Sequence, residues 1–400
     1  MRHLRYFIFL RDTLWIALTS FGGPQAHISL FFTQFVDKRR YISEEELIEL
    51  NALCQILPGP TSTQTITAIG YRIGGLPLAL LTLFVWTVPT VSMMIAAALL
   101  LNRLQEQNIS LSFTRFIQPM AVGFIAHAAL RISKKIIKTK TALFLMVASA
   151  AISTWAYQPW VFPLIILAGG VVTAFKFEKQ PQEAHRPLRI RWRYFTLYAG
   201  LFAGLALAAD ISNSFSLRIL TNFYRLGSLI FGGGQVLVPM MYGEFVKFKH
   251  LLNGNEFLTG YAIAQAMPGP TFSFASYVGA LAMRNYGPTG SIWGGILAAT
   301  GVFLPGTFLI FFVIQFWDEL KKYRPVRASL EGINATSAGL VIAAAILLFF
   351  PLIESPNLRL FWNIFFVAGT FLLLQYTRIP APLIVVLGVI LGFIIKSSGV

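Results

Sequence analysis

Residues 54–64 read Cys-Gln-Ile-Leu-Pro-Gly-Pro-Thr-Ser-Thr-Gln, inside a chain in which 56% of the residues are hydrophobic. Proline removes a backbone donor and clashes with the preceding helical turn, and glycine adds conformational freedom, so a helix cannot run straight through this stretch. Residues 265–275 read Gln-Ala-Met-Pro-Gly-Pro-Thr-Phe-Ser-Phe-Ala, which repeats the same break in the second half of the chain. Any account of the fold must explain why a hydrophobic chain carries this break twice.

The composition predicts an all-α polytopic membrane protein. Only 12% of the residues are charged, against about 25% in a typical soluble protein. Apolar runs close to the roughly 20 residues that a membrane span needs recur along the chain. They lie at 77–101, 117–132, 141–157, 160–175, 195–209, 290–315, 333–350, 358–375 and 380–396. The single cysteine, Cys54, excludes an intrachain disulfide and a cysteine-based metal site. We expect neither a cofactor nor a bound metal.

The net charge of +16 is explained by membrane topology rather than by nucleic-acid binding. When the basic segment 176–193 is placed in the cytoplasm, most of the Lys and Arg residues fall on the same side, as the positive-inside rule requires. The sequence therefore predicts a multi-pass protein of the inner (plasma) membrane with a cytoplasmic N-terminus. Its expected surroundings are the lipid bilayer and no nucleic acid, and a homodimer is left open.

An internal repeat is the most informative feature of the sequence. When the chain is shifted so that Pro58 lies over Pro268, 21–61 lies over 231–271 with thirteen identical positions, among them both Pro-Gly-Pro-Thr motifs. After a short insertion near 284–290 the shift is longer, and it then matches Pro89 with Pro305. The duplication covers almost the whole chain.

One span, 195–209, has no counterpart in the other copy and reverses the direction in which the second copy starts. The sequence therefore predicts two inverted repeats, at 1–175 and 211–400, joined by a basic linker and an unpaired span at 176–210. With each broken element counted once, about 13 membrane segments result. Inverted repeats with broken helices are typical of secondary transporters.

Each half carries two breaks, a Gly-rich one at 21–23 or 231–234 and a Pro-Gly-Pro one at 58–60 or 268–270. Broken backbone is tolerated at membrane depth where it is buried in protein or lines a cavity, and half-helix N-termini attract anions. Kinks that only serve packing are the alternative. The predicted substrate-binding residues are Gly22, Gly23, Gln55, Pro58, Gly59, Pro60, Thr61, Thr63, Gly232, Gly233, Gly234, Gln265, Pro268, Gly269, Pro270, Thr271 and Ser273.

Three further residues are candidates for a charge or proton role. Arg72 could balance a dianion or be an ordinary arginine of the cytoplasmic face. His27 titrates in a useful range, but its repeat counterpart is Leu237, so packing is the alternative. Glu244 could carry protons or pair with Arg225, and a surface carboxylate without a role is favoured.

Glu46 and Glu256 are a matched pair in the repeat, each a few residues ahead of a Pro-Gly-Pro segment. We expect them to hold helix starts, because a carboxylate three residues after a cap can accept from the cap's main-chain N–H. A role in gating access is the alternative.

The stretches FGGPQAHI, LCQILPGPTSTQ and IGYRIGG in the first half, with FGGGQVLVPMM and AQAMPGPTFSFASYVGA in the second, resemble the chromate transporter family in its long two-domain form. The sequence departs from the family pattern at Tyr41, where Trp is common, and at 247–253. The resemblance implies an inner-membrane antiporter that exports chromate, a sulfate-like dianion, with the proton gradient as driving force. Chromate resistance of the host would follow.

Alternatives to this function are a transporter for sulfate or another inorganic anion, and an anion channel. A membrane-embedded enzyme is least favoured, because the spans lack a compact cluster of His, Asp or Glu and carry no nucleophile motif.

Overall fold

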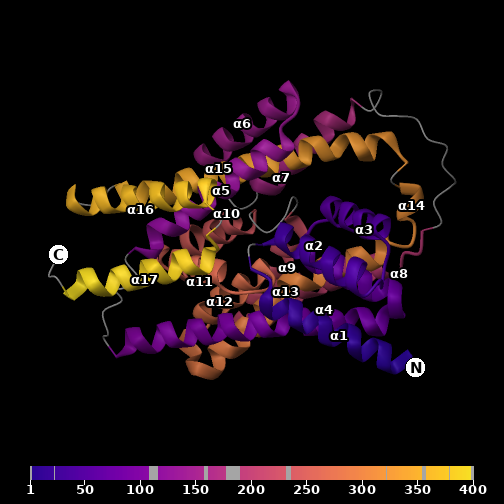
Figure 1. Cartoon of the computed structure of the whole chain (residues 1–400), viewed down its shortest axis with the longest axis horizontal. Helices are drawn as coiled ribbons and strands as arrows, with labels where there is room; N and C mark the ends of the chain where they lie inside the picture. The colour runs from indigo at the N-terminus through magenta and orange to yellow at the C-terminus, as the bar shows by residue number, and fades with distance from the viewer. Residues whose placement is uncertain are drawn as a thin grey trace. The chain divides into compact units, whose positions relative to one another are not determined.

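The computed structural model describes residues 2–21, 23–107, 116–156, 161–176, 190–230, 236–320, 322–353, 357–377 and 379–397. Within these ranges all regular structure is helical, which confirms the predicted all-α class (Figure 1).

The first copy of the repeat begins with α1 (Arg2–Thr19), α2 (Pro24–Phe31), the π-helix η1 (Phe32–Lys38), α3 (Glu44–Ile56) and α4 (Thr61–Glu106). Gly23 has a φ of 78°, a conformation that glycine adopts without strain, and Pro24 then opens α2. Ser43 and Glu46 form a capping box at the start of α3. The prediction that Glu46 holds a helix start is therefore confirmed.

The second copy has α9 (Phe215–Leu229), α10 (Leu237–Met241), η4 (Tyr242–Phe248), α11 (Gly254–Ala266), η5 (Thr271–Ser273), α12 (Phe274–Ala282), η6 (Arg284–Tyr286) and α13 (Gly287–Val313). Three features fall at matching positions of the two copies. They are the bounds of the π-helices η1 and η4, the bounds of the helices α3 and α11 that follow, and the helix starts at Thr61 and Thr271. Asn253 and Glu256 bond to each other's main-chain N–H as Ser43 and Glu46 do. The helix-start prediction therefore holds for Glu256 too.

Helix α4 is a hairpin of two helical arms rather than one rod. Gly74 and Gly75 leave helical geometry, and Gly75 has a φ of 69°. Residues on opposite sides of this turn touch, because a Cβ added to Gly70 would lie 2.5 Å from Thr82 Oγ1. We call the two arms the first arm (61–73) and the second arm (76–106). The break at 58–60 is thus followed by a short helical arm, a turn and the apolar run predicted at 77–101.

The remaining helices are α5 (Ile117–Ile136), α6 (Lys140–Trp155), α7 (Val161–Ala174), α8 (Arg193–Ser212), α14 (Trp317–Leu320), α15 (Arg324–Ile353), α16 (Asn357–Tyr376) and α17 (Ala381–Ser397). Each of the nine predicted spans coincides with one of the helices or with the second arm of α4. Among the described residues, four helices are long and apolar enough to cross a membrane, and shorter apolar helices accompany them. The chain is a multi-pass membrane protein.

The chain forms two compact units, and each draws on both halves of the sequence. Unit 1 comprises 1–96, 182–234 and 267–323, and unit 2 comprises 97–181, 235–266 and 324–400. In Figure 1 the indigo α1–α3 and the orange α12 and α13 belong to unit 1, and the purple α5–α7 and the yellow α16 and α17 belong to unit 2. Helix α4 passes from unit 1 into unit 2 at residue 97. The interleaving means that contacts between repeat copies form the interior of each unit.

The core of unit 1 is a cluster of buried side chains from α1, α2, η1, α3, both arms of α4, the end of α13 and the start of α14. Phe9, Phe31, Phe35 and Trp86 are its largest members with 0% exposure. In unit 2, α15 packs against α5, α6 and α7, and α5 in turn packs against α16 and α17. Both cores are therefore built from helices of both copies.

Candidate functional site

The two Pro-Gly-Pro turns of unit 1 are held by a reciprocal pair of main-chain hydrogen bonds. We call residues 58–60 the first turn and residues 268–270 the second turn. Gly59 N–H donates to the carbonyl of Ile230 (2.7 Å), and Gly269 N–H donates to the carbonyl of Ser20 (2.9 Å). The two donors are counterparts in the repeat, and so are the two acceptors. Each turn therefore binds the residue just before the Gly-rich break of the other copy.

The side chains that hold the two turns differ. At the first turn, Gln64 Nε2 donates to the carbonyls of Pro58 (2.9 Å) and Gly306 (3.1 Å). At the second turn, Thr90 Oγ1 donates to the carbonyl of Pro268 (2.8 Å). Thr90 and Gly306 are counterparts, because they directly follow the matched prolines of the second arm and α13. Equivalent residues of the two copies therefore take part in holding the two turns: Gly306 through its carbonyl at the first turn, and Thr90 through its hydroxyl at the second.

The first arm starts at the first turn as a buried half-helix. Thr61, Ser62 and Thr63 are 8%, 4% and 2% exposed. The first main-chain bond of this helix runs from Gln64 N–H to the carbonyl of Pro60. The preceding N–H groups lack an intrahelical acceptor, and they carry the partial positive charge of a helix N-terminus. Such a start suits an oxyanion that has shed its water.

The corresponding start after the second turn is a short 3₁₀ turn that leads into α12. Ser273 and Ser276 are both 0% exposed, and within the described structure neither hydroxyl makes a hydrogen bond. Thr271 is half-buried. Polar groups therefore follow each turn inside unit 1.

His27 lies beside the half-helix that follows the first turn and is 0% exposed. Its Nδ1 is 3.0 Å from Ser62 Oγ, and its ring meets the Trp86 indole edge-on at 5.2 Å between centroids. Trp86 Nε1 donates to Thr63 Oγ1 (3.1 Å). The ring therefore links α2 to both arms of α4.

The structure brings the proline, glycine and threonine residues of the two motifs, together with Ser273 and His27, into unit 1. Gly22, Gly232, Gly233 and Gly234 lie outside the described residues. Gln55 is exposed on α3, and Gln265 lies in unit 2, where its Nε2 is buried without a hydrogen-bond partner in the described structure. Arg72 is exposed at the tip of the α4 hairpin, as expected of an arginine at a membrane face.

The favoured interpretation of Glu244 as a surface carboxylate is wrong. Glu244 is 1% exposed, because η4 turns it into the core of unit 2. Its carboxylate pairs with Lys249 Nζ (2.9 Å), a partner that the sequence analysis did not name. Burial of a carboxylate requires such a cation, since an unpaired charge in the interior is costly.

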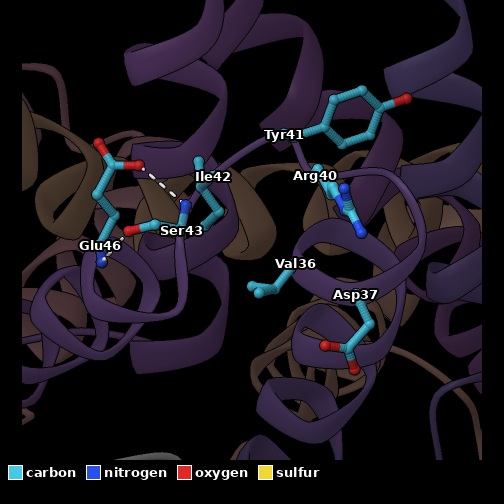
Figure 2. Close-up of a pocket in the computed structure, with 7 residues that line it drawn as sticks. All are labelled: Val36, Asp37, Arg40, Tyr41, Ile42, Ser43 and Glu46. Carbon is cyan, nitrogen blue, oxygen red and sulfur yellow. Dashed lines mark hydrogen bonds between the residues drawn. The ribbon is translucent and has the colours of Figure 1, made fainter.

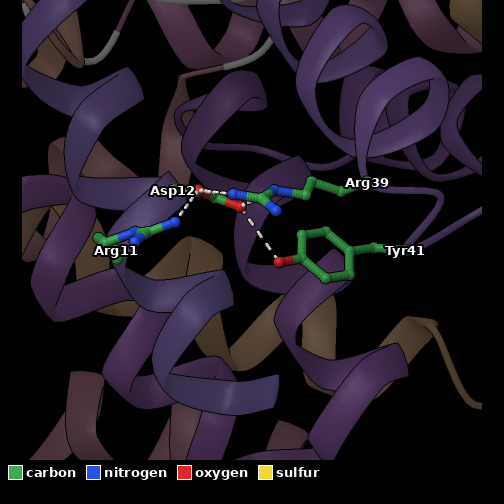
Figure 3. A network of polar contacts seen from close by, with 4 residues as sticks. All are labelled: Arg11, Asp12, Arg39 and Tyr41. Carbon is green, nitrogen blue, oxygen red and sulfur yellow. Dashed lines mark hydrogen bonds and ion pairs between the residues drawn. The ribbon is translucent and has the colours of Figure 1, made fainter. Parts of the chain in front are cut away.

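A second buried carboxylate, Asp12 of α1, is held in the network of Figure 3. Arg39 Nε lies 2.8 Å from Asp12 Oδ2, Arg39 Nη2 donates to Oδ1 (3.2 Å), and Tyr41 Oη donates to Oδ2 (3.1 Å). Burial and the nearby Asp12 carboxylate raise the pKa of Tyr41 to about 12. Arg39 and Lys249 are counterparts in the repeat, so equivalent cations neutralise non-equivalent carboxylates.

A cavity of about 630 Å³ lies over the start of α3. It is lined by Val36, Asp37, Arg40, Tyr41, Ile42, Ser43 and Glu46. Figure 2 shows Glu46 turned back onto the Ser43 main chain, where it closes the capping box. The carboxylates of Asp37 and Glu46 repel anions, so this cavity is not the candidate oxyanion site.

Sequence reasoning missed several residues that shape the site, namely Ser62, Gln64, Trp86, Thr90 and Gly306. A signal existed for one pair, because Thr90 and Gly306 follow the matched prolines directly. No signal marked Gln64, whose repeat counterpart is Phe274. In the part of the chain that the structure describes, no three His, Cys, Asp or Glu side chains are grouped so that they could hold a metal ion.

Comparison with known proteins identifies the family. The sequence profile described as "Chromate transporter" matches the chain twice, at residues 7–174 and 217–393. The chain is 24% identical over 386 residues to the chromate transport protein of Cupriavidus metallidurans, covering 94% of this chain and 89% of that protein. It is 24% identical over 383 residues to a probable chromate transport protein of Synechococcus elongatus, covering 94% and 92% of the two chains.

An uncharacterized transporter of Methanocaldococcus jannaschii is 26% identical over 385 residues, which cover 95% of this chain and 92% of that protein. No solved structure matches the chain. The two profile matches together cover most of the sequence, in the two halves that contain the paired turns. The chain therefore belongs to the chromate transporter family.

Proposed function

We propose that this chain is a secondary transporter that carries chromate, or a sulfate-like oxyanion, across the plasma membrane. Family membership supports the class of protein, and one observation supports the site: the buried start of the first arm. Its free N–H groups and the hydroxyls of Thr61 and Ser62 can replace the water that a dianion loses. The equivalent start after the second turn supplies Thr271 and Ser273.

We also propose that the two halves are inverted repeats, at 1–175 and 211–400, joined by 176–210. The reciprocal hydrogen bonds of the turns are those expected of a two-fold relation, in which residue i meets j′ and i′ meets j. The second arm and α13 run antiparallel: Gly295, early in α13, packs on Ile95, and Phe311, at its end, meets Tyr71 beside the hairpin tip (5.5 Å). An antiparallel pair of counterparts fits an axis in the membrane plane.

Alternating access would then require the contacts between copies at the two turns to change. In the arrangement described here the first half-helix start is closed off, since Thr61 is only 8% exposed. We propose export of the anion in exchange for protons, which would make a host chromate-resistant. An anion channel is the alternative, because it would use the same helix starts without alternating closure.

The proposal is tested by counterflow in liposomes that contain the purified chain. Vesicles loaded with unlabelled chromate are diluted into chromate-51, and transient accumulation of label is expected, because a carrier exchanges the two pools. The paired variant Thr61→Val and Thr271→Val should lower the rate by about tenfold or more, since each hydroxyl bond to a charged group is worth about 1.5–3 kcal/mol. Thr154→Val, at a partly exposed threonine of α6, is the matched control.

Sulfate added outside should compete if the site accepts dianions in general. Label that equilibrates without an overshoot would favour a channel. Absence of any chromate movement by correctly inserted protein would contradict the chromate assignment, and sulfate and other oxyanions would be tested next.

A further inference from the structure

We propose that the transported oxyanion is held at the second half-helix start, with the hydroxyls of Ser273 and Ser276 as its side-chain donors, an inference that rests on the proposed transport function. This start follows the second turn directly. The 3₁₀ turn η5 runs on into α12 without a gap, so 271–282 forms one apolar helical segment. Ser273 N–H donates to the carbonyl of Pro270 (2.9 Å), and the two N–H groups before it have no acceptor within the helix.

The two serine hydroxyls are the first observation. Both side chains are 0% exposed, and within the part of the chain that the structure describes neither hydroxyl makes a hydrogen bond. Ser273 is the N-cap residue of α12, yet its side chain makes no capping bond. Ser276 lies one turn further on the same face, and helical side chains lean toward the N-terminus, so both hydroxyls are directed toward the start. A buried donor without a partner is costly, and an acceptor at the start would remove that cost.

Other buried hydroxyls of unit 1 behave differently, which is the second observation. Five of them donate to the carbonyl four residues earlier in their own helix, and need no other partner: Thr65, Thr67, Thr82, Ser228 and Thr307. Ser276 also follows such a carbonyl, that of Phe272, but does not bond to it. The donor of Ser276 therefore stays available to a ligand. Its repeat counterpart is Ile66, so this hydroxyl belongs to the second copy alone.

The third observation is the contrast with the first half-helix start. Thr63, the repeat counterpart of Ser273, already accepts a hydrogen bond from Trp86 Nε1 (3.1 Å). In the second copy the counterpart of Trp86 is Val302, whose side chain has no polar group. Ser273 is therefore left without the partner that Thr63 has. Of the two starts, the second is the one with buried side-chain donors that an anion can take.

A third buried hydroxyl lies at the same turn. Ser20, whose carbonyl accepts from Gly269 N–H (2.9 Å), is 0% exposed, and its Oγ has no hydrogen-bond partner in the described structure. Helices α12 and α13, which pack against each other, carry no charged side chain. Asp12 of α1 lies eight residues before Ser20, about 12 Å along the helix, and it is paired with Arg39. In the described parts of these three helices, no unpaired carboxylate therefore opposes an anion at the start.

The ligand that fits this start is a dianion whose outer atoms are all hydrogen-bond acceptors. The N–H groups at the positive end of the helix and the serine hydroxyls supply donors in place of water. A cation would meet the unfavourable end of the helix dipole. Because α12 and α13 offer no cationic side chain, binding depends on these hydrogen bonds. The loss of one hydroxyl should therefore weaken it measurably.

Equilibrium binding to the purified whole chain tests this assignment. Chromate-51 is titrated at constant sodium concentration in a buffer alkaline enough that chromate stays a dianion, with unlabelled sulfate as competitor. Ser273→Ala and Ser276→Ala should each raise the Kd by about tenfold or more, because each removes a hydroxyl bond to a charged group. Ser228→Ala, at a buried serine that donates to its own helix, is the matched control and should keep the wild-type Kd.

Thermal unfolding gives a second readout, and its first part needs no ligand. Ser276→Ala removes an unpaired donor, so without anion it should unfold at the wild-type temperature or above it. Chromate or sulfate should raise the melting temperature of the wild-type chain by binding the folded state, and should raise that of Ser276→Ala less at the same concentration. A lower melting temperature for Ser276→Ala without anion would show that its hydroxyl is bonded within the fold, which overturns its role as a donor to the anion.

The outcomes separate this inference from the transport function. Weaker binding by both serine variants, with Ser228→Ala unchanged, supports the second start as the anion site. Wild-type affinity in both variants overturns that assignment while chromate binding itself stands. An effect in only one variant overturns the donor role of the other serine. If the wild-type chain binds neither chromate nor sulfate, the transport function fails and this inference fails with it.

Discussion

The two Pro-Gly-Pro turns have the same main-chain bonds and different side-chain supports. Each turn donates its glycine N–H to the other copy. The first turn is then held by Gln64, whose repeat counterpart is Phe274, and the second by Thr90, whose counterpart is Gly306. Backbone geometry can survive duplication while side chains diverge, because a carbonyl accepts equally well from an amide or a hydroxyl. The comparison therefore predicts that equivalent substitutions will have unequal effects.

The largest effect is expected at the two glycines of the turns. Gly59 and Gly269 have φ values of 119° and 91°, where any other residue is strained by about 1–2 kcal/mol. A Cβ on Gly269 would also overlap Thr90 Oγ1 and break its bond to Pro268, worth about 1 kcal/mol more. Gly269→Ala should therefore destabilise the chain by about 3 kcal/mol and more than Gly59→Ala does.

Thermal unfolding of the purified variants in detergent measures this difference. Gly200→Ala on α8, where an added methyl meets nothing within 4 Å, is the control and should be neutral or stabilising. Combining Gly269→Ala with Thr90→Gly should recover part of the loss. Equal losses at the two turns would contradict the asymmetry.

The next effect is expected at Gln64. Gln64→Leu removes the donor of two buried carbonyls, Pro58 and Gly306, and should cost about 2–4 kcal/mol, since each unmet buried acceptor costs about 1–3 kcal/mol. The matched control is Gln55→Leu at an exposed glutamine, which should change stability by less than about 0.5 kcal/mol. The melting temperatures of the two variants check the prediction. An unchanged melting temperature for Gln64→Leu would show that another donor reaches these carbonyls.

A smaller effect is expected at Thr90, because its hydroxyl serves one carbonyl instead of two. Thr90→Val should cost about 1–2 kcal/mol. Thr87→Val, at a threonine that bonds only to Leu83 of its own helix, is the control and should cost less. Melting temperatures measure these losses, and a decrease for Thr90→Val as large as that for Gln64→Leu would contradict the prediction.

The smallest effect is expected where the two copies agree most closely. Ser43→Ala and Asn253→Ala each remove the side-chain acceptor of a capping box, and each should cost about 1 kcal/mol. Because the caps lie in different units, the two losses should add in the double variant. If the two variants lowered the melting temperature by different amounts, the two caps would share their geometry but not their contribution to stability.

Much of the fold follows from the sequence pattern, because the bilayer imposes a long apolar run on every span. The nine predicted spans coincide with helical segments for this reason, and Pro24, Ser43 and Thr61 begin helices where proline, capping and post-proline rules place them. The candidate site was predictable in its motifs but not in its partners. Gln64 and Trp86 carry no local pattern that distinguishes them from ordinary residues of a membrane helix.

Glu244 illustrates the same limit. Its sequence surroundings fit a surface carboxylate, and the π-helix nevertheless places it in the core beside Lys249. A π-helix shifts the direction of side chains relative to an α-helix, so α-helical periodicity does not give the face on which Glu244 lies.

The sequence by itself determined the membrane environment, the duplication, the positions of the breaks and the family resemblance, because these depend on composition and on spacing along the chain. Only the tertiary structure decided that each compact unit takes helices from both copies, and that Gly59 and Gly269 exchange bonds with Ile230 and Ser20. The physical reason is that such contacts join residues from opposite halves of the chain, far beyond the reach of local preferences. Local preferences determine where a helix begins, and packing alone determines which distant segment forms hydrogen bonds with the backbone groups at that helix end.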